Sequence, residues 1–88
     1  MRMEGIVEAR FVGIDVGKAR CRTAIMDHKG VIVDEFSFEN TPRGIDELMG
    51  RLYERDSVVM ESTGNLWLNI YNTLDSKGIR VVLANPIR

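Results

Sequence analysis

Two carboxylates stand where the chain is otherwise apolar, and their type and placement suit chemistry. Asp15 lies inside the run 11–16, and Glu61 directly follows the run 57–60. A carboxylate in an apolar strand is costly unless a cation, a metal ion or several hydrogen-bond donors lie near it. Two such acids from neighbouring strands, completed by water and phosphate oxygens, would suit a hard divalent cation such as Mg²⁺.

The same acids also have purely structural interpretations. Asp15 could accept hydrogen bonds from the turn at Gly17 and Lys18, and Glu61 could cap the following helix or pair with Lys18. Lys18, Arg20 and Arg22 form a small basic group that could bind nucleic-acid phosphate or could simply cover an exposed strand face. The residues alone leave these alternatives open.

The other chemically capable side chains have simpler explanations. His28 falls in a turn and Cys21 in a strand, and no Cys/His cluster has zinc spacing. Trp67 has the spacing of a helix core residue. We expect Ser62 and Thr63 to cap a helix, because neither has a base beside it of the kind that activates a nucleophile.

Hydrophobic periodicity predicts one α/β domain with the element order β-β-β-α-β-α-β. A turn at 27–30 joins the second and third strands. Thr41 and Pro42 start an amphipathic helix, whose apolar spacing continues to Tyr53. A second helix ends at Lys77 and Gly78. Strands are expected at 11–16, 20–26, 31–38, 57–60 and 80–84.

Two hairpins followed by right-handed crossovers predict a mixed sheet with strand order 3-2-1-4-5. Asp15 and Glu61 would then lie at the carboxyl ends of adjacent parallel strands, where open α/β sheets hold ligands. We expect strand 57–60 to be fully buried. Residues 1–10 are expected to be a loose lead-in to a domain at 11–88.

Composition excludes some classes of protein. The chain has 88 residues and a formal net charge of -1, so it lacks the basic field of a stand-alone DNA-binding domain. No apolar run approaches the roughly 18 residues of a membrane span. The N-terminus does not resemble a signal peptide, and one cysteine fits a reducing cytoplasm.

Four motifs in register resemble the N-terminal DEDD catalytic domain of IS110-type transposases, which is RuvC-like with a ribonuclease H fold. The resemblance covers about residues 11–88. It departs from the family pattern at Gly17, where the family usually has Ser. The motifs are GIDVGK at 13–18, NTPRG at 40–44, ESTG at 61–64 and VVLANP at 81–86.

The resemblance implies that Asp15 and Glu61 are catalytic residues that hold Mg²⁺ or Mn²⁺. The remaining two Asp of the family pattern lie beyond the Asn-Pro segment. The chain is therefore expected to be part of a longer DNA transposase or recombinase, with half a metal site and little or no activity alone. DNA and a guide RNA are the partners implied. The helix expected to carry those two Asp is missing from residues 11–88. Its absence would expose apolar sheet surface and favour homo-oligomers.

Three other functions remain as alternatives. A Holliday-junction-resolvase-like nuclease would use the same acids, although the Glu-Ser-Thr-Gly and Asn-Pro motifs argue against it. A nucleotide-binding domain of the actin or sugar-kinase type also opens with a β-meander, but its second phosphate motif is not found in the sequence. A dimerisation module would have no active site.

Overall fold

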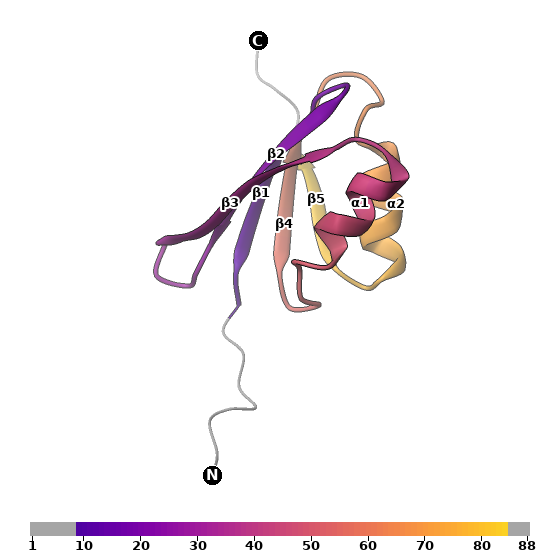
Figure 1. Ribbon diagram of the computed structural model, residues 1–88. Coiled ribbons are helices and arrows are strands. Elements are labelled where there is room, and N and C mark those ends of the chain that lie inside the picture. The colour runs from indigo at the N-terminus through magenta and orange to yellow at the C-terminus, as the bar shows by residue number, and fades with distance from the viewer. Residues whose placement is uncertain (1–8, 85–88) are drawn as a thin grey trace.

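The chain forms one mixed five-stranded sheet with two helices against one of its faces (Figure 1). The computed structural model describes residues 9–84, so residues 1–8 and the Asn-Pro motif lie outside the described part. The observed strand order, β3-β2-β1-β4-β5, confirms the predicted topology and places β1 at the centre. The elements are β1 (Phe11–Asp15), β2 (Arg20–Met26), β3 (Ile32–Glu39), α1 (Pro42–Met49), β4 (Ser57–Glu61), α2 (Leu68–Ser76) and β5 (Arg80–Ala84).

The alternation of strand residues divides the sheet into a covered face and an open face. The covered face packs against α1 and α2. The opposite face carries no helix from residues 9–84, and we call it the open face (Figure 1). Strand residues buried on the covered face are Val12, Ile14, Cys21, Thr23, Ile25, Phe38, Val58 and Met60.

The prediction that strand 57–60 is fully buried is wrong. Val59 is 47% exposed, and Asp15 and Glu61 are exposed as well. Their side chains lie on the open face, because every second residue of β1 and β4 points away from the helices. Asp15 therefore avoids the desolvation cost that a buried carboxylate would carry.

Helix α1 begins as predicted but ends early. The Thr41 hydroxyl accepts a hydrogen bond from the Gly44 N–H at 3.0 Å, and Pro42 occupies the first helical position. The helix ends at Met49. The apolar spacing suggested a longer helix because Leu52, in the loop that follows α1, is also buried in the core.

Helix α2 begins differently from the prediction. It starts at Leu68, and Trp67 at the N-cap position makes no side-chain capping hydrogen bond. Ser62 and Thr63 therefore do not cap it; the Ser62 hydroxyl instead donates to the Thr63 carbonyl at 3.1 Å. The predicted stop is confirmed, because Gly78 follows the helix with φ +77°. Neither helix of the described chain has the length and apolar character needed to span a membrane.

The predicted turn between β2 and β3 is confirmed. Gly30 has φ +85° and donates its N–H to the Asp27 carbonyl at 3.0 Å. The Asp27 carboxylate accepts from the N–H groups of Lys29 at 2.8 Å and Val31 at 3.0 Å. These backbone hydrogen bonds, that from Val31 foremost, lower the pKa of Asp27.

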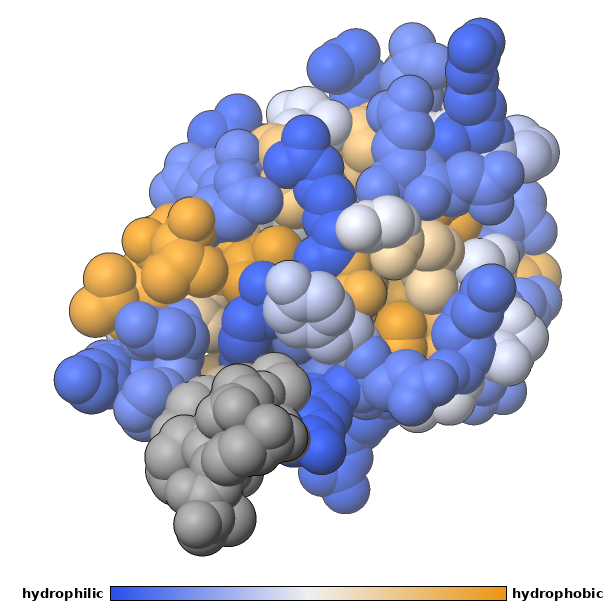
Figure 2. All heavy atoms as spheres, turned by 60° about the horizontal axis from the view of Figure 1, so that its bottom comes forward, coloured by the Kyte–Doolittle hydropathy of each residue, from blue (hydrophilic) through white to orange (hydrophobic). Residues whose placement is uncertain are grey.

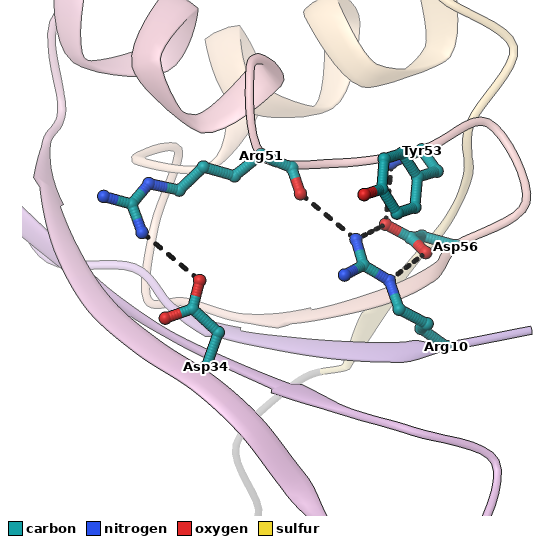
Figure 3. Close-up of polar contacts among 5 residues, drawn as sticks. All are labelled: Arg10, Asp34, Arg51, Tyr53 and Asp56. Atoms are coloured by element: carbon teal, nitrogen blue, oxygen red, sulfur yellow. Dashed lines mark hydrogen bonds and ion pairs between the residues drawn. The ribbon is translucent and has the colours of Figure 1, made fainter.

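An ion pair between a buried carboxylate and a partly buried guanidinium closes the end of the sheet opposite the acids (Figure 3). Arg10 donates from Nε and Nη2 to the carboxylate of Asp56 at 2.9 and 2.7 Å. Asp56 also accepts the Tyr53 N–H at 2.8 Å, and the Arg10 guanidinium lies 4.2 Å from the centre of the Tyr53 ring. Hydrogen bonding to Asp56 raises the pKa of Arg10. Arg10, assigned to the lead-in from the sequence, is thus firmly held.

Exposed apolar side chains also gather over the β2–β3 hairpin, on the left of the view in Figure 2. Val31, Ile32 and Val33 there are each about half exposed. Ile32 pairs with Met26 of β2, and Met26 pairs with Phe11 of β1. The open face of the sheet is therefore continuous with this apolar hairpin.

Candidate metal and phosphate site on the open face

Asp15 and Glu61 lie side by side at the carboxyl ends of β1 and β4. The two strands are parallel, and Asp15 pairs in register with Glu61. Neighbouring strands lie about 4.8 Å apart, so both carboxylates can reach one ion. The Val16 N–H donates to the Glu61 carbonyl at 2.9 Å, which continues the strand pairing just past the acids.

Neither acid has a structural partner within residues 9–84. No described N–H or cation bonds to the Asp15 carboxylate, and Glu61 neither caps α2 nor pairs with Lys18. Both structural interpretations of the acids therefore lack support in the described part of the chain. Two adjacent carboxylates without partners repel each other, and a cation between them would relieve that repulsion.

A hollow of about 460 Å³ on the open face contains both acids. Small residues on the strands, Gly13, Ala24 and Ala84, line part of this hollow and leave space for it. A second hollow of about 240 Å³ extends past the strand ends, between the acids and the loop at Ser62 and Thr63. Space for a ligand thus lies on both sides of the carboxylate pair.

Of the three predicted phosphate-binding residues, one lies beside the acids and two lie beyond them. Arg22 pairs in register with Asp15 and lines the same hollow, where its guanidinium donates to Glu35 at 3.2 Å. Arg20 is exposed two residues further toward the start of β2, and Lys18 is exposed in the β1–β2 loop. The structure therefore brings Arg22 to the acids, whereas Arg20 and Lys18 lie beyond them.

Other metal-ligand types are not gathered here. No group of three or more His, Cys, Asp or Glu side chains with metal-binding geometry occurs among residues 9–84. Cys21 is buried, and burial raises the pKa of its thiol, so it stays protonated at neutral pH. The two carboxylates fit a hard divalent cation as part of its ligand set, and other oxygen ligands would have to complete it.

Asn40 is a site residue that the sequence patterns did not predict. Its side-chain amide donates to the carbonyl of Gly17 at 3.0 Å and to the carbonyl of Leu66 at 3.1 Å. These carbonyls belong to the loops that follow Asp15 and Glu61. The signal that could have identified it is its position at the head of the NTPRG motif.

Comparison with solved structures gives only weak similarity. A Ppx/GppA family member from Aquifex aeolicus is 17% identical over 91% of this chain and 36% of its own, with a TM-score of 0.48. A second structure of the Aquifex aeolicus PPX-GPPA enzyme has 17% identity, coverage of 91% and 37%, and a TM-score of 0.47. The chain spans little more than a third of these proteins. A search of curated proteins finds no match.

A family model describes nearly the whole chain. The model of the DEDD transposase domain of the IS110 type, described as a transposase, matches residues 12–88. This span includes both acids, all five strands except the first residue of β1, and the four motifs of the sequence analysis. The chain therefore belongs to the IS110 family of DEDD transposases.

Proposed function

We propose that the chain is the N-terminal part of a Mg²⁺-dependent DNA transposase or recombinase that acts on phosphodiester bonds during insertion-element transposition. The observation that carries the proposal is the in-register pairing of Asp15 with Glu61 on an open, hollowed face. Membership of the transposase family supports this assignment.

The two acids would hold a divalent cation, Mg²⁺ or Mn²⁺, with Asp15 at the centre strand and Glu61 beside it. When bound, such an ion supplies charge neutralisation at the phosphate and a lowered pKa for a bound water. Arg22 would contact a phosphate oxygen near the acids, and Arg20 and Lys18 would bind the backbone further along. Local placement of these cations compensates for a net charge of only -1.

The complete protein would supply the rest of the site. Two carboxylates are half of the acid set that the family pattern contains, so the 88-residue chain alone should have little or no activity. DNA is the substrate in this proposal, with a guide RNA as a second partner and the cytoplasm as the place of action. The nucleotide-binding function is the competing outcome of the tests below.

The acid pair can be tested by titrating the isotope-labelled chain with Mn²⁺ and following its amide NMR signals. We expect selective paramagnetic broadening at residues 15–17 and 61–63, which Asp15→Asn and Glu61→Gln each abolish. Asp46→Asn is a matched control, because Asp46 is an exposed acid on α1, on the covered side of the sheet. Broadening that survives both substitutions would overturn the metal assignment.

The substrate distinguishes the transposase function from the nucleotide-binding alternative. Transposition by the full-length parent protein should be lost in Asp15→Asn and kept in the Asp46→Asn control. Calorimetric titration with Mg-ATP should give no binding heat. Tight ATP binding would instead favour the nucleotide-binding alternative.

A further inference from the structure

We propose that Asn40 is a positioning residue that braces the two loops behind the acids and thereby keeps Asp15 and Glu61 at one level. This inference rests on the proposed function, because it explains how the two acids are kept at the same level, where they could hold one metal ion. It also explains the NTPRG motif, whose first residue has no other role in the site.

The side-chain amide of Asn40 reaches one loop from each acid strand. Its Nδ2 donates at 3.0 Å to the carbonyl of Gly17, two residues after Asp15, and at 3.1 Å to the carbonyl of Leu66, five residues after Glu61. An amide nitrogen carries two N–H donors, so both are used. One side chain therefore joins the β1–β2 loop to the loop between β4 and α2.

Asn40 itself is fixed by its neighbours. Its backbone N–H donates to the Ala19 carbonyl at 2.9 Å. The next residue, Thr41, caps α1, and a Cβ on Gly44 would overlap the carbonyl oxygen of Glu39. The chain before and after Asn40 is thus held by close backbone contacts, and a side chain mounted there can hold two loops in place.

The chemistry selects an amide at this position. Two carbonyl oxygens face the Asn40 side chain, so the group between them must donate twice. A carboxylate has the same shape but only accepts, and it would repel both carbonyls. Asn40→Asp therefore removes the brace at nearly constant volume, while Asn40→Ser keeps a single, shorter donor.

Hydrogen exchange provides a test that needs no metal. The Val16 N–H donates to the Glu61 carbonyl and reports the pairing of the strands at the level of the acids. In Asn40→Asp we expect the Val16 amide to exchange about tenfold faster relative to the core amide of Ile25, with a smaller effect in Asn40→Ser. Thr41→Ala is the control, because it weakens α1 and leaves the Asn40 bonds intact.

A purely structural role would change all protected amides together, as Thr41→Ala should. If the ratio of Val16 to Ile25 exchange stays at the wild-type value in both Asn40 variants, the brace is overturned.

Mn²⁺ affinity separates this inference from the function on which it rests. We expect Asn40→Asp to weaken Mn²⁺ binding about tenfold or more, because the two carboxylates would lose their common level, and changes outside the ligand set cost metal affinity by this order. The added negative charge alone would strengthen binding, so unchanged or tighter binding contradicts the positioning role. If wild type shows no site-specific binding while Val16 exchange responds, the brace stands and the metal site fails.

Discussion

At the scale of the residue, the chain places chemically similar acids in opposite environments. Asp56 is 1% exposed and accepts hydrogen bonds from Arg10 and from the Tyr53 N–H. Asp15 and Glu61 are exposed and have no partner within residues 9–84. Partners, rather than residue type, therefore separate the carboxylate that stabilises the fold from the two that are available to a ligand.

Removing the buried partner should destabilise the protein strongly. We expect Asp56→Ala to lower the free energy of unfolding by about 1–3 kcal/mol, because it leaves the Tyr53 N–H and the partly buried Arg10 guanidinium without their acceptor. The matched control is Asp34→Ala, which breaks the exposed pair between Asp34 and Arg51 and should cost less than about 1 kcal/mol. Urea denaturation measures both, and equal costs would contradict the assignment.

The hairpin turn should respond to acid. The pKa of Asp27 lies below its ordinary value of 3.8 in the folded chain, chiefly through the Val31 N–H. Its contribution to stability is therefore fully present above the unfolded pKa and is lost as the pH falls through the lower, folded value. A carbon-detected NMR titration of Asp27 should have its midpoint below 3.8, and the Lys29 and Val31 amides should shift with it. Amide shifts with a different midpoint would contradict this.

At the scale of the element, glycines distinguish a crowded junction from an open one. A Cβ at Gly44 would overlap the Glu39 backbone, whereas a Cβ at Gly50 would meet the Glu47 carbonyl at an ordinary 3.5 Å. We expect Gly44→Ala to cost about 1–3 kcal/mol and to shift the end of β3 against the start of α1. Gly50→Ala should be neutral or stabilising by up to about 1 kcal/mol. Thermal unfolding of both variants tests the contrast.

The element order was predictable because each element carries local signals. Alternation in β2 and the cap at Thr41 place those elements correctly, and the predicted bounds of β2 and β5 are those observed. The end of α1 was not predictable, because Leu52 keeps the helical spacing while it lies in a loop. The start of α2 was not predictable either, because Trp67 replaces a polar cap.

The site was predictable only in part. The pairing of Asp15 with Glu61 followed from strand order, because both acids end their strands. Their exposure could not be predicted, because an apolar strand has the same kind of sequence whether the second face of the sheet is covered or open. Asn40 and Asp56 act through contacts 23 to 46 residues away along the chain, which no local pattern encodes.

At the scale of the whole molecule, the open face should promote self-association. It carries Phe11, Val59 and Val82, each about half exposed, in one apolar patch. We expect concentration-dependent dimers in sedimentation, weakened by Val59→Lys or Val82→Lys. Leu68→Lys is a matched control, because Leu68 is 45% exposed but lies on α2. Monomers at every concentration, or an equal effect of Leu68→Lys, would contradict the prediction.

The register of β1 and β4 also limits how the length of such a chain can change. Side chains alternate along a strand, so one residue inserted between Ser57 and Glu61 would turn Glu61 toward the helices. The same insertion would move Met60, now fully buried, toward solvent. Insertions and deletions should therefore be rejected within either acid-bearing strand.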